Sequence, residues 1–223
     1  MNNDLQALWL TLKLAILTTL ILLTISPFIA WWLAKTKNKL RPLFEALVAL
    51  PLVLPPTVLG FYLLLAFSPN YLPGQIWQSL TGSTLAFSFS GLLIGSIIYS
   101  LPFVVQPLQA GFVTLGNKEL EAAKTLGMSR RSTIKHIIIP MTKRSFLLAA
   151  VMGFAHTLGE FGVVLMIGGN IPGETQVLAI SLFEHVEAFE YQQAHQIAGG
   201  LLISSLVMLV LIYAFLQNKD ARN

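Results

Sequence analysis

The most reactive side chains in this sequence are two ionisable residues inside an otherwise apolar stretch. His156 and Glu160 occur in the run His-Thr-Leu-Gly-Glu-Phe-Gly, in which Gly159 and Gly162 flank the acid. A carboxylate in apolar surroundings is costly, and in a membrane it could serve as a proton or cation site. The favoured alternative is a structural acid held by neighbouring groups, because a single intramembrane acid is weak support for a proton relay.

No other residues have the composition or spacing of a catalytic or metal site. The sequence has no cysteine, which excludes thiolate chemistry and a disulfide framework. Its four histidines and ten acids show no metal-ligand spacing, and it lacks a glycine-rich phosphate loop, a zinc-helix motif and a serine nucleophile elbow. We therefore predict that the chain is not an enzyme and carries no metal or cofactor of its own.

The composition is that of a membrane protein. Of the 223 residues, 55% are hydrophobic and only 11% are charged, under half the charged share of about 25% in soluble domains. The 72 consecutive residues 46–117 contain no Asp, Glu, Lys or Arg. Such a stretch excludes a soluble enzyme, a nucleic-acid-binding module and a disordered chain.

Five stretches are long and apolar enough to cross a bilayer, which takes about 20 helical residues. The sequence therefore predicts an all-α integral membrane protein with five transmembrane helices. The predicted spans are residues 14–34, 46–67, 85–112, 145–169 and 196–216.

The positive charges predict the orientation of these spans. Segment 35–41 contains four Lys or Arg residues, the connection 118–144 contains seven and the C-terminal tail contains two, whereas 68–84 and 170–195 contain none. The positive-inside rule then places the N-terminus outside and the C-terminus in the cytoplasm. The same rule explains the basic net charge better than a nucleic-acid partner does.

Three prolines interrupt the second predicted span. Pro51, Pro55 and Pro56 fall within six residues and precede Thr57, and each proline in a helix removes a hydrogen bond and crowds the preceding turn. A break at membrane depth is tolerated against protein or a watery cavity. The candidate pathway residues are therefore Pro51, Pro55, Pro56, Thr57, Gly159, Glu160 and Gly162, with Ser96, Ser100 and Gln106 as further polar candidates. A packing kink without a transport role is the alternative.

The inner connection 113–145 contains a short helix with clear start and stop signals. Asn117 suits an N-cap, acids follow in the first turn, and Gly127 suits a C-terminal stop. The predicted helix, 118–126, is too short to span a bilayer and marginal on its own in water. A groove on a cytoplasmic partner would hold it in place.

This connection resembles a known motif. The spacing of Glu121-Ala122-Ala123, Gly127 and Pro140 resembles the EAA motif of ABC importer permeases, with Ile139 where that family has Leu. Two further stretches, 50–60 and 158–162 joined to 170–175, resemble molybdate permeases, and the first of these also resembles sulfate permeases. The resemblance covers about residues 8–216.

The resemblance implies the architecture, function and partners. It implies a type I ABC importer permease (MetI-like) fold over residues 8–216, with a coupling-helix loop at 113–145 and a cytoplasmic tail at 217–223. The function implied is molybdate import across the bacterial cytoplasmic membrane. The partners implied are a second copy of the chain, two ATP-binding subunits that carry ATP and Mg, and a periplasmic or extracellular oxyanion-binding protein. Coupling to the ATPase would fall to Glu121, Ala122, Ala123, Gly127 and Pro140.

Other interpretations remain open at this point. The same architecture could import tungstate or sulfate, or the chain could be an ion-coupled secondary transporter that uses Glu160 and His156. A membrane scaffold without transport is less compatible with proline-broken spans. The acids Glu184, Glu187 and Glu190 in the outer segment 170–195 suit a solvated face or a docking surface for an external partner.

Overall fold

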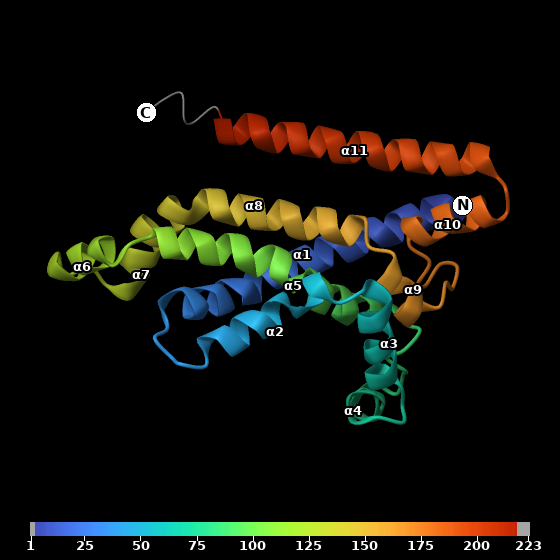
Figure 1. Ribbon diagram of the computed structural model, residues 1–223, viewed down its shortest axis with the longest axis horizontal. Coiled ribbons are helices and arrows are strands. Elements are labelled where there is room, and N and C mark those ends of the chain that lie inside the picture. Colours follow the sequence, from blue (N-terminus) through green and yellow to red (C-terminus); the bar gives the residue numbers. More distant parts are fainter. Residues whose placement is uncertain (1–2, 218–223) are drawn as a thin grey trace.

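The computed structural model describes residues 3–217, and every regular element in that range is a helix (Figure 1). Four helices are long and apolar enough to cross a membrane, and a strongly bent pair brings the number to five. The chain is therefore a multi-pass membrane protein, as its composition predicts. Of the predicted tail 217–223, all but Gln217 lies outside the described residues. The long helices are α1 (Asn3–Lys35), α5 (Phe89–Thr114), α8 (Ile139–Leu158) and α11 (Tyr191–Gln217).

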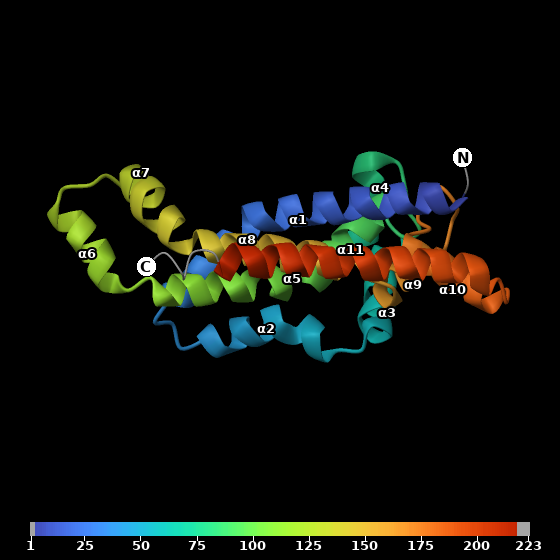
Figure 2. The same cartoon turned by 90° about the horizontal axis from the view of Figure 1, so that it is seen from above.

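Helices α1, α5 and α8 form the packed centre of the bundle and run side by side (Figures 1 and 2). Leu22 of α1, Leu108 of α5 and Ala149 of α8 are fully buried in one cluster. By contrast, α11 contacts mainly α10 (Leu178–Glu187) and leaves most of its apolar surface uncovered. Such a helix needs lipid or another chain around it.

The second span is broken where the prolines predict. Helix α2 (Arg41–Val53) ends before Leu54 and Pro55, which are extended, and α3 (Pro56–Phe67) leaves at 110° to it. Pro55 disfavours a helical conformation at Leu54, while Pro56 suits the first position of a new helix. The break is therefore caused by the backbone restrictions of these two prolines. It turns α3 away from the bundle axis (Figure 1).

An additional helix, α4 (Leu72–Thr81), follows α3 in the connection that the sequence analysis left without structure. Its Pro-Gly pair at 73–74 resembles a turn signal. Pro73 lies in the first helical turn, however, where its missing N–H would have had no partner within the helix. The helix ends at Gly82, which has a φ of +73°.

The helix of the fourth predicted span begins before residue 145 and is interrupted toward its C-terminal end. Helix α7 (Arg130–Thr133), a π-helical turn η1 (Ile134–Ile138) and α8 form one continuous helical segment from Arg130 to Leu158. The basic residues of 130–144 were expected in a connection, whereas they lie within this helical segment. After a break at 159–161 the chain continues as α9 (Gly162–Gly168).

A polar cluster ties α1 to α10 at the end of the bundle opposite α6 (Asn117–Thr125) (Figure 1). His185 of α10 contacts Asp4 through Nε2 at 3.1 Å and Glu190 through Nδ1 at 2.7 Å. Ser181 donates a hydrogen bond to the same Asp4 carboxylate at 2.6 Å. Hydrogen bonds to Asp4 and then Glu190 raise the pKa of His185 above its ordinary value. Glu184, nearby on α10, instead accepts from Asn170 and Gln176.

This cluster predicts a pH-dependent stability. Because the pKa of His185 is raised on folding, its contribution is fully present below the ordinary histidine pKa of about 6.5 and is lost as the pH rises through the raised value. We expect His185→Gln to lower the thermal unfolding temperature in detergent more at about pH 5.5 than at about pH 8.5. An equal loss at both pH values would show that the charged form of His185 contributes nothing.

Candidate coupling helix and translocation cavity

Helix α6 projects from the end of the bundle as an isolated element (Figures 1 and 2). The prediction of a short helix at 118–126 is met within one residue, but its N-cap is Gly116 and not Asn117. The side chain of Asn117 instead accepts a hydrogen bond from Lys35. Polar side chains at a helix start can bond to other partners, and here a residue distant in the sequence supplies the donor.

The EAA residues of α6 divide between an exposed face and a buried one. Glu121 and Ala122 are exposed, whereas Ala123 is 1% exposed. Just beyond the helix, the large apolar side chain of Leu126 is 78% exposed. The exposed residues Glu121, Ala122 and Leu126 are therefore accessible to a partner at this end of the molecule.

Gly127 ends this segment in a conformation that favours glycine. Its φ is +69°, and its N–H donates to the Lys124 carbonyl, while the N–H of Met128 donates to the Ala123 carbonyl. Paired bonds of this kind satisfy the last carbonyls of a helix when the residue after it is left-handed. The φ, and not crowding, requires glycine, since nothing lies within 4 Å of an added Cβ.

Pro140 lies in the first turn of α8, immediately after the π-helical turn. The helical segment that contains Pro140 already begins at Arg130. Pro140 therefore lies within a helical segment that leads from the α6 end of the bundle to the break at 159–161.

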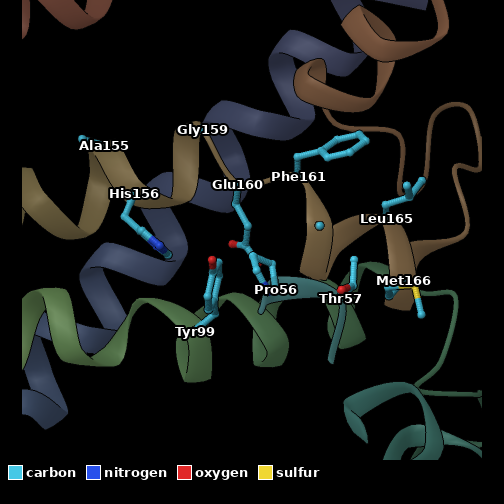
Figure 3. Close-up of a pocket in the computed structure, with 11 residues that line it drawn as sticks. Pro56, Thr57, Tyr99, Ala155, His156, Gly159, Glu160, Phe161, Leu165 and Met166 are labelled. Atoms are coloured by element: carbon cyan, nitrogen blue, oxygen red, sulfur yellow. The ribbon is translucent and has the colours of Figure 1, made fainter. Parts of the chain in front are cut away.

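A cavity of about 590 Å³ lies where the two broken spans meet (Figure 3). It is bordered by the start of α3, by α5, and by the break between α8 and α9. Thr57 and four other predicted pathway residues line this cavity. Its lining is Pro56, Thr57, Tyr99, Ala155, His156, Gly159, Glu160, Phe161, Gly162, Leu165 and Met166.

Pro51 and Pro55 do not line the cavity. Pro51 is buried within α2, and Pro55 lies exposed at the break itself, so both act on the course of the chain. Three lining residues were not predicted from the sequence, namely Tyr99, Phe161 and Met166. Aromatic and apolar residues inside apolar spans carry no local signal that could have identified them.

Glu160 is held by α5. The residue is 4% exposed, and its Oε2 accepts a hydrogen bond from Ser96 Oγ at 2.8 Å. Its other oxygen, Oε1, has no hydrogen-bond partner among the described residues. A buried acceptor without a partner is costly. The Glu160 side chain therefore links the α8–α9 break to α5 through Oε2. Its Oε1 has no partner among the described residues and lies at the edge of the cavity.

His156 is fixed by a separate set of contacts on α5. Its Nδ1 lies 2.8 Å from Ser100 Oγ, and its ring stacks on Phe103 with centroids 3.7 Å apart. Ser100 also lies 3.0 Å from the hydroxyl of Thr157. Among the described residues no hydrogen bond joins His156 directly to Glu160, and the two have separate partners on α5. Gln106, further along α5, is exposed and lies outside the cavity lining.

The two breaks pack directly on each other. A Cβ added at Gly162 would lie 2.8 Å from the Cβ of Pro56, and one added at Gly60 would lie 2.7 Å from the Cβ of Met166. Only glycine permits this approach. Consequently α3 and α9 form one unit whose position relative to α5 and α8 determines the shape of the cavity.

The cavity offers hydroxyl groups, an imidazole, a carboxyl group and aromatic rings, and none of its lining residues is Lys or Arg. Neutral donors can hydrogen-bond to an anion as it passes but do not hold it strongly. The Ser100 hydroxyl that contacts His156 is buried in α5 and does not line the cavity. No metal-ligand group of three or more residues occurs among the described residues. The geometry of the cavity suits passage of a solute better than a reaction.

A family comparison accounts for the exposed helix and the broken spans together. Residues 26–222 match the sequence pattern of the binding-protein-dependent transport system inner membrane component. The chain belongs to this family. The members of this family are membrane components of transport systems.

Individual relatives in this permease family are similar over nearly the whole chain. The chain is 52% identical to the molybdenum transport system permease protein ModB of Azotobacter vinelandii, over 96% of this chain and 94% of the relative. It is 33% identical to the sulfate transport system permease protein CysT of Escherichia coli, over 86% and 69%. A solved inward-facing MetNI methionine ABC transporter superposes with a TM-score of 0.72 at 13% identity, over 96% and 94%. The fold is that of type I ABC importer permeases.

Proposed function

We propose that this chain is the molybdate-translocating membrane subunit of an ATP-driven ABC importer. The observation that carries the proposal is the 52% identity, over nearly the full length of both chains, to a molybdenum permease. The exposed helix α6 and the cavity between two broken spans provide the two parts that such a subunit needs. We further propose that the chain itself hydrolyses no ATP and that ATP and Mg bind to a separate subunit.

The proposed assembly contains two copies of this chain, two ATP-binding cassette subunits and an oxyanion-binding protein outside the membrane. The positive charges support a position in the bacterial inner membrane with α6 in the cytoplasm and the N-terminus outside. The uncovered apolar surface of α11 is compatible with a second copy beside it. A two-fold pair would place a pathway along its axis.

The proposed coupling runs from α6 to the cavity along one helical segment. Glu121 anchors α6 to the ATPase by charge or hydrogen bonds, and the small residues Ala122 and Ala123 let the helix seat closely. Gly127 turns the chain back into the segment that contains Pro140. ATP-driven movement of α6 then shifts α8 and, through the break beside Glu160, the cavity. Rigid-body rocking of this kind alternates access between the two sides.

The experiment that tests this function is molybdate uptake into proteoliposomes that contain this chain and its ATPase. We expect uptake to require the loaded binding protein, internal ATP and an intact ATP site, and to stop with orthovanadate. An ionophore that collapses ion gradients should leave uptake unchanged. Uptake that follows an ion gradient and ignores ATP would instead establish the secondary transporter that uses Glu160 and His156.

Sulfate or tungstate as cargo is the second candidate, and the 33% identity to a sulfate permease favours it. The cavity itself does not distinguish tetrahedral dianions, because its polar groups are neutral hydroxyls, one imidazole and one buried carboxyl group. Competition by unlabelled sulfate, tungstate and molybdate in the same assay ranks the three. Stronger competition by sulfate than by molybdate would reassign the cargo and leave the architecture unchanged.

A further inference from the structure

Helix α1 is hydrogen-bonded at both of its ends to segments far from it in the sequence. It contributes no residue to the cavity lining and is not part of the EAA region. Its role in transport is therefore not explained by the pathway or by contact with the ATPase. The bonds at its two ends suggest a different role, which rests on the proposed function.

The α6 end of α1 is attached through Lys35, the last residue of the helix. Its Nζ donates to the Leu115 carbonyl at 2.6 Å and to Asn117 Oδ1 at 3.4 Å. Leu115 caps the C-terminus of α5, where carbonyls lack partners and a positive charge is favourable. Asn117 begins α6. Lys35 therefore holds the two residues between which the chain passes from the bundle into α6.

The opposite end of α1 is attached to α10. Asp4 accepts from Ser181 at 2.6 Å and contacts His185 at 3.1 Å. Further along, the buried hydroxyl of Thr11 accepts from the Leu178 N–H at 2.7 Å, which satisfies a donor at the start of α10. By the proposed orientation, α10 lies on the side where the binding protein arrives.

Between these ends α1 is one uninterrupted helix of 33 residues, although it contains Pro27. At 1.5 Å per residue it is about 50 Å long. It packs along both α5 and α8, and side chains such as Leu14, Leu22 and Leu33 are almost completely buried. A helix packed in this way along its length moves as a rigid element.

We infer that α1 is a transmission rod that couples α6 to α10, with Lys35 and Asp4 as the positioning residues at its two ends. Movement of α6 pulls on Lys35, and the packed helix carries that movement to the α10 surface. In the reverse direction, a binding protein that presses on α10 is sensed at α6. Helix α1 thus couples α6 to α10 without using residues that line the cavity.

The test is a double-mutant cycle in the reconstituted complex of this chain, its ATPase and its binding protein. The variants are Lys35→Met, Asp4→Ala and the double variant, with Lys35→Arg as the conservative rescue. The readout is the ratio of ATPase activity with molybdate-loaded binding protein to basal activity. Exposed residues close to each end supply the matched controls, Lys37→Met and Glu187→Ala.

Each single variant is expected to lower the stimulation ratio by at least about fivefold, the low end of typical couplings between sites. Basal activity and the amount of assembled complex should stay within about twofold, since the lost contacts are only partly buried and lie at the two ends of α1, away from its packed middle. Lys35→Arg should restore the ratio, and both controls should match the wild type. The stimulation ratio of the double variant should be no lower than that of the more impaired single variant, because both changes interrupt the same coupling.

Two results would overturn the rod. One is an unchanged stimulation ratio in Lys35→Met or Asp4→Ala. The other is a double variant whose loss is the product of the single losses, because sites this far apart add independently when nothing connects them. Failure of the proposed function would look different, since the wild-type complex itself would show no stimulation by the binding protein.

Discussion

Gly127→Pro is expected to abolish uptake while the chain still inserts into the membrane. Proline fixes φ near about −65°, whereas Gly127 has a φ of +69° between α6 and α7. The chain cannot turn at this point without moving α6, so the proposed contact between this helix and the ATPase would be lost. We expect uptake to fall to background and the ATPase to be lost from pull-downs.

Gly82→Pro is the matched control for this prediction. Gly82 also follows a short helix, has a φ of +73° and has nothing within 4 Å of an added Cβ. It lies after α4, however, far from α6 (Figure 1). This variant carries similar strain but should keep ATPase binding. Normal uptake by Gly127→Pro would refute the coupling role of α6.

Gly162→Val is expected to impair transport by forcing the two broken spans apart. A Cβ at position 162 would lie 2.8 Å from the Cβ of Pro56, a rigid ring at the start of α3. Overpacking typically costs about 1–3 kcal/mol, enough to shift a conformational equilibrium by about fivefold or more. We expect uptake to fall by at least that factor, with ATPase binding intact because α6 is unchanged.

Gly199→Val controls for the general effect of valine in place of a glycine in a span. Gly199 lies in α11, and nothing lies within 4 Å of an added Cβ there. It should transport at close to the wild-type rate. Should Gly162→Val transport equally well, the contact between the two breaks would have no role in shaping the pathway.

Much of the fold could be predicted because membrane burial leaves a strong signal over whole segments. Apolar length located the spans, and Pro55 and Pro56 located the break between α2 and α3. The charged segment 130–144 misled the prediction, since the hydrophobic count treats Arg130 and Lys135 as loop residues although they continue the helix of α8. Helix α4 was missed because its ten residues are too few to span a bilayer, and the prediction was based on the length of apolar segments.

The candidate site was predictable only in part, for a related reason. Glu160 stands out in sequence because an acid is rare in a span, and Gly162 was noted because it flanks that acid. That Glu160 bonds to Ser96, or that Gly162 meets Pro56, depends on how distant helices pack. From the sequence, Lys35 contributed only to the positive charges that predict the orientation of the spans. Its hydrogen bond to Leu115 joins residues 80 positions apart, which no local pattern indicates.

The lining of the cavity has a consequence for where selectivity arises. It contains no Lys or Arg, the side chains that would hold a doubly charged anion most strongly. Under the proposed function, discrimination among similar anions then falls to the protein that delivers the anion. Such an importer would change its cargo by replacement of the external binding protein, with this chain unchanged.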